Sequence, residues 1–209
     1  SYYALTNEHV VGPVGNEVYQ PDNGNSNFLF GTVMQSVANA TIDAAVVSFG
    51  AGEDFANYVL QVGSIQGTYN LQTTDVGNCI VQKSGNISGL TFGTVEAIDY
   101  TVVDGQVTMT NQIKIEDIPG LSPFSQPGDS GAVVMNDHYQ VVGLLWGGEN
   151  NESYACAIAS VLSQLNVQMV VDHCPPLYAV TNGYTGLNPS DVCEVAVYDT
   201  QWSPSSEIN

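Results

Sequence analysis

The sequence predicts an all-β protein, folded either as a β-sandwich or as a pair of β-barrels. Short apolar segments rich in β-branched and aromatic residues recur along most of the chain, and turn-forming residues separate them. Only residues 157–167 have helical spacing, with one apolar stripe formed by Ile158, Val161, Leu162 and Leu165. We therefore expect strands almost throughout, with one short helix towards the C-terminus.

The expected strands fall into two groups. The first group, within residues 1–75, comprises an apolar strand that breaks into a polar turn at about residue 7, and then 28–37, 42–49 and 58–62. The second group, within residues 76–172, comprises 79–83, 90–100, 106–115, 132–135, 139–146 and 154–158. A C-terminal extension over 173–209 adds strand-like segments at 177–181 and 192–202. We therefore expect two β-units followed by an extension.

The composition narrows the range of partners. The 209 residues include 21 acidic side chains and only two basic ones, Lys83 and Lys114, so the formal net charge is −19. Such a surface repels polyanions, which argues against nucleic acid and anionic membranes as partners. No apolar run approaches the ~18 residues of a membrane-spanning helix. Metal-ligand spacings and phosphate-binding glycine motifs are also missing, so we expect no cofactor or metal.

Cysteines and glycosylation sequons favour an extracellular location. The four cysteines allow two disulfides, and a bond between Cys174 and Cys193 would close a small loop in the extension. The other two, Cys79 and Cys156, could bridge strands of the second unit or remain buried thiols. Glycosylation sequons begin at Asn39, Asn86 and Asn151.

The stretch 126–134 can present a reactive hydroxyl. Gly128 and Gly131 bound an Asp129-Ser130 pair, and glycine allows backbone conformations closed to other residues. The amides of Gly128 and Ser130 could then point together beside the Ser130 hydroxyl, as acyl transfer requires. The alternative is an ordinary β-turn, in which Gly, Asp and Ser are common.

A serine nucleophile needs a base, and the base needs a group to orient it. Of the three histidines, His138 lies at an expected hairpin tip and His173 at the end of the last regular element, where a structural role fits better. His9 lies in a polar turn between apolar residues. Asp43 heads an otherwise apolar strand, where a carboxylate needs a committed partner. The imidazolium of His9 is the obvious candidate, and a strand-start cap is the alternative.

The order His9, Asp43, Ser130, each within its own block, resembles the chymotrypsin-fold (trypsin-like) serine peptidases. The histidine block, residues 5–11, is most similar to the bacterial Htr-type version, and residues 83–95 resemble the segment that opens the second barrel. The resemblance implies two antiparallel β-barrels with one closing helix. It also implies His9 as general base, Asp43 as its orienter, Ser130 as nucleophile and the amides of Gly128 and Ser130 as oxyanion hole.

The same resemblance indicates where a substrate would bind. It implies a primary specificity pocket walled by Leu145, Trp146, Gly147 and Gly148, with Phe124 near its floor. An aromatic residue at the floor predicts an apolar pocket with no preference for Lys or Arg. The alternative is that Phe124 packs in the core.

The chain departs from the family pattern at its start. The family has about two strands before the histidine strand, but here the histidine is residue nine, so the first barrel lacks its usual leading strands. Either an upstream segment has been removed or is supplied by another chain, or strands of the extension complete the barrel.

Three functions follow from these observations. The first is a secreted serine endopeptidase acting on protein or peptide substrates. The second is an inactive protease-fold protein with a binding or structural role. The third is a latent enzyme that still holds its own cleaved N-terminal segment as a partner.

Overall fold

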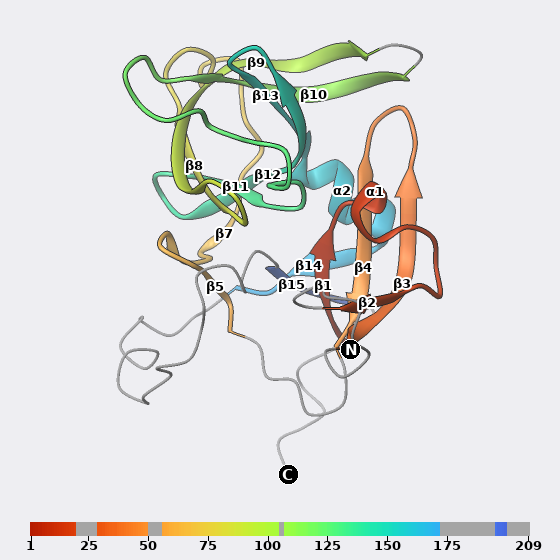
Figure 1. Ribbon diagram of the computed structural model, residues 1–209. Helices are drawn as coiled ribbons and strands as arrows, with labels where there is room; N and C mark the ends of the chain where they lie inside the picture. Colours follow the sequence, from red (N-terminus) through yellow and green to blue (C-terminus); the bar gives the residue numbers. More distant parts are fainter. Residues whose placement is uncertain (20–28, 50–55, 105–106, 172–194, 200–209) are drawn as a thin grey trace, which may run out of the picture.

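The structure confirms a protein built mainly of β-strands, arranged in two large sheets (Figure 1). This computed structural model describes residues 1–19, 29–49, 56–104, 107–171 and 195–199. The first sheet contains β1 (Tyr2–Thr6), β2 (Glu17–Tyr19), β3 (Leu29–Ala38), β4 (Asp43–Ser48), β14 (Val167–Met169) and β15 (Val195–Asp199). Their spatial order is β14-β15-β1-β4-β3-β2.

The second sheet closes on itself. It contains β7 (Gly67–Thr68), β8 (Ile80–Gly85), β9 (Gly89–Asp104), β10 (Val107–Asp117), β11 (Val133–Asn136), β12 (Gln140–Glu149) and β13 (Glu152–Ala157), in the order β11-β8-β9-β10-β13-β12-β7. Because β11 also pairs with β12, these strands form a barrel, to which β7 adds a short parallel strand. Two further short strands, β5 (Tyr58–Val59) and β6 (Gly63–Ser64), follow β4 along the chain and precede β7. They pair with each other in a separate two-stranded sheet.

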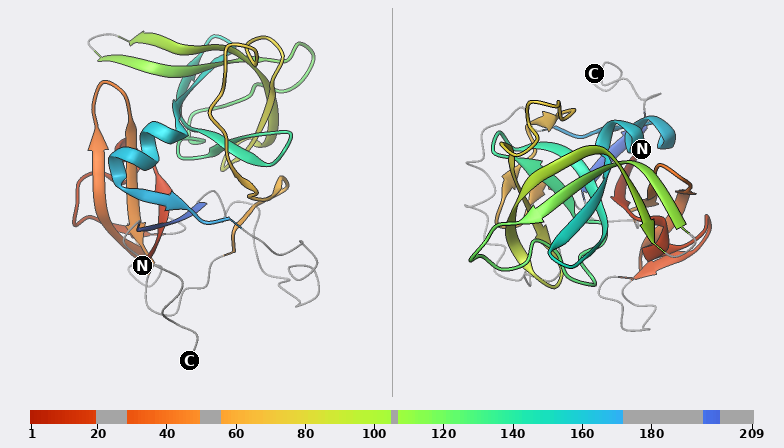
Figure 2. Two further views of the ribbon diagram at one scale, coloured as in Figure 1. Left: turned by 180° about the vertical axis from the view of Figure 1, so that it is seen from behind. Right: turned by 90° about the horizontal axis from the view of Figure 1, so that it is seen from above.

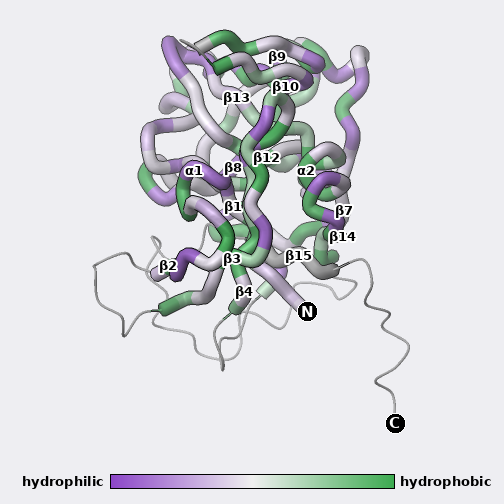
Figure 3. The backbone as a smooth tube through the Cα atoms, turned by 90° about the vertical axis from the view of Figure 1, so that its right-hand side faces the viewer, coloured by the Kyte–Doolittle hydropathy of each residue, from purple (hydrophilic) through white to green (hydrophobic). Residues whose placement is uncertain are grey.

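The described part of the chain contains two helices, whereas the sequence predicted one. The predicted helix is confirmed as α2 (Ile158–Leu165), which buries Ile158, Val161 and Leu165 and ends at Asn166 in the left-handed conformation. Figure 3 colours α2 in both hydrophilic and hydrophobic shades, as expected for a helix with one buried face. The expectation of a single helix was wrong, because the structure also contains α1 (Glu8–Val11). This helix is only four residues long and buries none of them, so the sequence shows no apolar stripe that would predict it.

The largest hydrophobic core is shared by the two sheets. Leu5, Ile42 and Val46 come from the first sheet or its turn, and Val133 and Leu144 from the second. Helix α2 adds its apolar face to the same core, and Figure 2 shows it packed beside both sheets. A second core fills the interior of the barrel. The shared core holds the ends of β1 and β4 close to the barrel, which decides where the candidate site can form.

A strand of the C-terminal extension joins the first sheet. β15 lies between β1 and β14 and pairs antiparallel with both, with Tyr2 opposite Tyr198 and Leu5 opposite Val195. This pairing occupies the edge of β1 that is opposite β4, as the interpretation with strands from the extension requires. Among the described strands, β2 and β14 remain the two ends of the sheet, so completion of a first barrel stays a prediction.

The cysteines that the structure describes are unpaired. Cys79 is half-buried and Cys156 is buried, and both are free thiols. Of the two alternatives for this pair, a bridge between strands is therefore wrong. The predicted Cys174–Cys193 disulfide and His173 lie outside the described residues.

Candidate active site

His9 and Asp43 meet at the end of the first sheet. β1 stops at Thr6, and the chain turns through Asn7 into α1, which carries His9 on its exposed side. Asp43 is the first residue of β4, so its carboxylate lies at the end of the sheet where α1 begins. Gly12 ends α1 with a φ of 75°, a conformation that favours glycine.

The Asp43 carboxylate binds the histidine through two contacts. Oδ2 makes a short hydrogen bond with His9 Nδ1, and Oδ1 accepts a hydrogen bond from the His9 backbone N–H at 3.1 Å. The hydrogen bond with Asp43 raises the pKa of His9 above its ordinary value of 6.5, although partial burial opposes the shift. Because Nδ1 is committed to Asp43, Nε2 is the nitrogen left to exchange a proton with a substrate or a nucleophile.

The nucleophile loop is a tight turn that begins with Gln126. The Asp129 N–H donates to Gln126 O at 3.0 Å, and the Ala132 N–H donates to Asp129 O at 3.1 Å. Gly128 has a φ of 101° and Gly131 a φ of 92°, so both glycines are needed for this path. Within the described part of the chain, the N–H groups of Gly128 and Ser130 have no hydrogen-bond acceptor. Two donors are therefore free beside the Ser130 hydroxyl.

A buried ion pair anchors this loop to the barrel. Lys83 Nζ lies 3.1 Å from Asp129 Oδ2, and neither side chain is exposed. The Asp129 carboxylate also accepts hydrogen bonds from the N–H groups of Ile87, Ser88 and Gln126 and from the Ser88 hydroxyl. Burial alone would raise the pKa of Asp129, but these hydrogen bonds outweigh it and lower the pKa below its ordinary value. The residue next to Ser130 is thus a fixed carboxylate.

The nucleophile loop lies against the end of β1. A methyl group added at Gly131 would come within 2.6 Å of Thr6 Oγ1, so the loop packs directly on the residue that precedes the turn to His9. The Ser130 hydroxyl donates to Trp146 O at 3.3 Å. Among the described residues, no hydrogen bond joins Ser130 to His9. The structure therefore brings His9 and Asp43 into contact and packs the serine loop on Thr6, three residues before His9, without a hydrogen bond between His9 and the Ser130 hydroxyl in the described part of the chain.

Comparison with solved structures identifies the fold. The chain matches a chymotrypsin from Cellulomonas bogoriensis with a TM-score of 0.63 and 22% identity, over 80% of this chain and 85% of the other. A serine protease specific for glutamic acid matches with a TM-score of 0.63 and 21% identity, over 80% of this chain and 90% of the other. Thermobifida fusca protease A matches with a TM-score of 0.63 and 20% identity, over 82% of this chain and 90% of the other. The chain has the chymotrypsin fold.

The comparisons extend no further than the fold. No family model and no curated protein matches the sequence. The solved structures named above are described as a chymotrypsin, a serine protease and a protease, but at 20–22% identity their likeness does not carry an activity to this chain. In particular, nothing supports the Htr-type subfamily over other branches of the fold.

The strand predicted to bind substrate is β12, beside the nucleophile loop. The Leu145 side chain is buried in the barrel core, and the Leu145 carbonyl already accepts the Gly131 N–H at 2.9 Å. Trp146 is half-buried: its ring stacks on Tyr154 with centroids 5.8 Å apart, and its Nε1 donates to Gln112. Gly147 and Gly148 are at least partly exposed and pair with β13 on one side only. The main chain from Trp146 to Gly148 is therefore the part of β12 that an extended peptide could reach.

Phe124 lies in the barrel core. It is fully buried among residues such as Val81 and Ile115, and its carbonyl accepts the Thr91 hydroxyl at 2.6 Å. Of the two roles left open for this residue, core packing is the one that the structure displays. The atoms nearest to a methyl group added at Gly148 would be the Glu152 carbonyl, the Ser125 hydroxyl and the Ser153 Cα. The Ser125 hydroxyl also lies 2.7 Å from the Ser153 hydroxyl.

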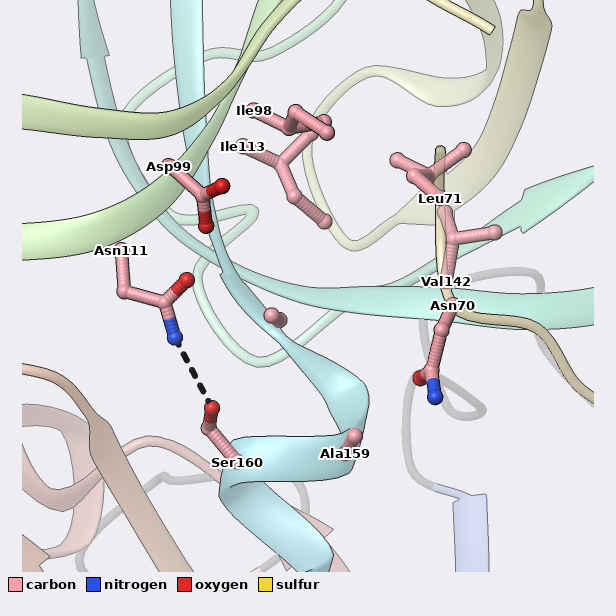
Figure 4. Close-up of a pocket in the computed structure, with 10 residues that line it drawn as sticks. Asn70, Leu71, Ile98, Asp99, Asn111, Ile113, Val142, Ala159 and Ser160 are labelled. Carbon is pink, nitrogen blue, oxygen red and sulfur yellow. Dashed lines mark hydrogen bonds between the residues drawn. The ribbon is translucent and has the colours of Figure 1, made fainter. Parts of the chain in front are cut away.

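A separate cavity of about 210 Å³ lies beside the N-terminus of α2 (Figure 4). Apolar side chains such as Leu71, Ile98 and Ile113 line it, together with Asp99 and Asn111, whose amide donates to the Ser160 hydroxyl at 3.1 Å. None of the candidate triad residues contributes to its lining. This cavity is thus distinct from the site around His9.

The remaining predicted sites are surface features. Asn39, Asn86 and Asn151 are exposed, as acceptors of a glycan must be, and His138 is exposed at its hairpin tip. In the described ranges, no group of three His, Cys, Asp or Glu side chains is arranged to hold a metal ion. No helix in the same ranges has the length and hydropathy to cross a bilayer.

Four residues around the site escaped the sequence analysis: Thr6, Asn7, Lys83 and Cys156. Lys83 carried a usable signal, because a cation in an apolar strand of a chain with two basic residues calls for a buried partner. Thr6, Asn7 and Cys156 carried none, since their contacts join segments far apart in the sequence.

Proposed function

We propose that this protein is a serine endopeptidase that works through an acyl-enzyme. The observation that carries the proposal is the His9–Asp43 pair: the carboxylate holds Nδ1 of a histidine whose other nitrogen has no partner among the described residues. Thr6, three residues earlier, packs on a serine loop that has two amide donors unused in the same part of the chain. The chymotrypsin fold supports the proposal, since the solved structures of that fold named above are described as a chymotrypsin, a serine protease and a protease.

The chemistry assigns one step to each group. His9 Nε2 takes the proton of the Ser130 hydroxyl as Oγ attacks the carbonyl carbon of a peptide bond. The N–H groups of Gly128 and Ser130 stabilise the oxyanion, and one such donor is worth ~3 kcal/mol of the barrier. His9 then gives its proton to the leaving amine as the C–N bond breaks, and a water molecule, deprotonated by His9, hydrolyses the acyl ester. Asp43 stays ionised and stabilises the imidazolium.

The apo structure holds the Ser130 hydroxyl on the Trp146 carbonyl. For attack, a rotation of the serine side chain must exchange this hydrogen bond for one to His9 Nε2. Catalytic hydrogen bonds are often long or unformed in apo enzymes and tighten when substrate binds. The buried Asp129 keeps the backbone of the loop fixed, so only the side chain has to move.

The substrate in this proposal is an extended peptide that pairs with Trp146–Gly148 of β12. Its primary side chain would meet the Ser125 hydroxyl beside Gly148. The protein would act outside the cell, a location that the three exposed sequons favour.

A fluorophosphonate probe tests the activity directly. We expect covalent labelling of the wild-type protein at Ser130, located by peptide mass spectrometry, and no labelling of Ser130→Ala. Ser163→Ala is the matched control, because it removes an exposed hydroxyl on α2 that has no role in the proposed binding or chemistry, and it should label like the wild type. A folded wild-type protein that resists the probe, in an assay where trypsin reacts, contradicts the proposal.

The second candidate function is a protease-fold protein that binds peptides without cleaving them. The observation that favours it is that Ser130 bonds to Trp146 and not to His9 in the described structure. If this function is correct, peptides bind to the wild type and to Ser130→Ala with equal affinity, and neither protein labels with the probe.

A further inference from the structure

Asp43 lies where the ladder between β1 and β4 runs out. That ladder ends with Thr6 opposite Ala45, and its register would continue with Asn7 opposite Ala44 and then Glu8 opposite Asp43. The chain instead leaves the strand at Asn7 and starts α1 at Glu8. The backbone groups of Asp43 therefore meet no strand partner on the β1 side.

The other neighbour of β4 does not supply these hydrogen bonds. Across the β3–β4 turn, the Asn39 N–H donates to Ile42 O. Because hydrogen-bonded and non-hydrogen-bonded pairs alternate in an antiparallel ladder, the next pair, Ala38 with Asp43, is of the non-hydrogen-bonded kind. The N–H and C=O of Asp43 thus point away from β3, towards the junction with the barrel.

Two side chains take the place of the missing strand. Asn7 Nδ2 donates to the Asp43 carbonyl at 2.7 Å, and the Asp43 N–H donates to Cys156 Sγ at 3.4 Å. Both side chains are fully buried. Asn7 belongs to the turn before α1, whereas Cys156 belongs to β13 of the barrel, so the two halves of the molecule each hold one backbone group of Asp43.

These contacts are not the arrangement that stability alone would favour. Asn7 Oδ1 is buried and has no hydrogen-bond partner among the described residues, and a buried polar atom left without a partner lowers stability. A thiol is also a weak acceptor compared with a carbonyl or hydroxyl. A buried polar group that is left unsatisfied calls for an explanation, and its contact with Asp43 offers one.

We propose that Asn7 and Cys156 are positioning residues: their hydrogen bonds hold the main chain of Asp43 in place and so orient its carboxylate towards His9. With the backbone fixed at both N–H and C=O, the side chain of Asp43 starts from a defined point, and its two oxygens reach Nδ1 and the backbone N–H of His9 together. The catalytic consequence rests on the proposed function; the geometry does not.

The titration of His9 reports on this alignment. The groups that act on its pKa are Asp43, through the hydrogen bond and its charge, and Glu8 on α1, and both raise it. β3, which also packs on α1, has no titratable side chain. A misaligned Asp43 therefore lowers the pKa of His9, while Glu8 is unchanged.

The test is an NMR titration of the imidazole protons in the full chain, with His9 assigned by the His9→Gln variant. We expect the pKa of His9 to fall towards 6.5 in Asn7→Ala and in Cys156→Ala. It should stay raised in Cys156→Ser, because a hydroxyl oxygen can accept the same hydrogen bond. Asn136→Ala is the matched control: it also removes a buried asparagine, but from a hairpin of the barrel, and should leave His9 unchanged.

A second readout follows the reaction. If Ser130 reacts with a fluorophosphonate, the rate constant of labelling should fall by about 10²-fold in the two alanine variants, the scale expected when a catalytic group is slightly misplaced. Cys156→Ser should retain the wild-type rate.

The outcomes separate this proposal from the proposed function. An unchanged His9 titration in both alanine variants, with circular dichroism showing them folded, overturns the positioning role. If Asn7→Ala does not fold, the comparison of Cys156→Ala with Cys156→Ser decides the question. If wild-type Ser130 never reacts, the peptidase proposal fails. The His9 titration then still tests whether Asn7 and Cys156 position Asp43.

Discussion

The two carboxylates of the candidate site are held in opposite ways. Asp43, in the first sheet, pairs with a histidine whose side chain is 44% exposed, whereas Asp129, in the barrel, pairs with Lys83 and neither side chain is exposed. Five hydrogen bonds or ion contacts surround the Asp129 carboxylate, and a closed barrel surrounds the pair. The barrel thus fixes the loop that carries Ser130 by burial, while the first sheet presents an imidazole that can reach solvent and exchange protons.

Because of this difference, the buried Asp129 pair should affect mainly stability, and the exposed Asp43 pair should affect mainly reactivity. A buried ion pair is costly to break but does not respond to moderate changes of pH. An exposed pair contributes little to stability and stays titratable. The same substitution, aspartate to asparagine, should therefore act mainly on the rate in one half and mainly on the folding free energy in the other.

The largest expected effect is on the rate, from Asp43→Asn. Without the carboxylate, His9 loses the group that fixes its tautomer, and kcat should fall by about 10⁴-fold, as the same change does in a catalytic triad. The free energy of unfolding should change by no more than ~1 kcal/mol, because the pair is partly exposed. Rates of a peptide or ester substrate and a urea titration measure the two quantities. A large loss of stability with an unchanged rate contradicts the comparison.

The next effect is on stability, from Asp129→Asn. The change leaves Lys83 buried without its counter-charge, which should lower the free energy of unfolding by ~3–5 kcal/mol. Adding Lys83→Met removes the orphaned charge and should restore part of the loss. Asp99→Asn, an exposed carboxylate of the same sheet, is the control and should have little effect. Denaturant titrations measure the free energy of unfolding of each variant. Equal values for all variants would show that the Lys83–Asp129 pair does not anchor the loop.

A smaller effect is expected where the halves touch, from Gly131→Ala. The new methyl would lie 2.6 Å from Thr6 Oγ1 at a φ of 92°, so we expect a loss of ~1–3 kcal/mol from strain. Gly15→Ala is the matched control, because Gly15 has a φ of 94° and open space around it. The stability lost in Gly15→Ala measures the cost of the positive φ alone. If the two variants lose equal stability, the contact with Thr6 does not constrain the loop.

The smallest effect is the pH dependence of the His9–Asp43 pair. The pKa of His9 is raised in the folded state, so the pair adds stability below about pH 6.5, and this contribution is lost as the pH rises through the folded pKa. The difference between wild type and His9→Gln should therefore shrink with rising pH, within ~1 kcal/mol. The rate of the proposed reaction moves the other way, because the base must be neutral, and falls as the pH drops through the same pKa. A difference in stability that grows between pH 6 and 9 would show that the pKa is not raised.

The sequence alone predicted the main strands and α2, because alternation and helical spacing are local patterns. It also singled out His9, Asp43 and Ser130 with a flanking pair of glycines, since a lone carboxylate in an apolar strand and a glycine-bounded serine are visible without coordinates. Their roles remain proposals. It missed α1, which is too short for a periodic signal, and it could not choose between two roles for Phe124.

Only the tertiary structure decided how these residues are supported. The pairing of β15 with β1, the burial of Lys83 against Asp129, and the hold of Asn7 and Cys156 on Asp43 all join segments separated by many residues. Local composition sets which segments become strands, because each residue's preference acts over its immediate neighbours. Which side chain satisfies a buried backbone group depends on how the two sheets pack, and that packing is a property of the whole chain.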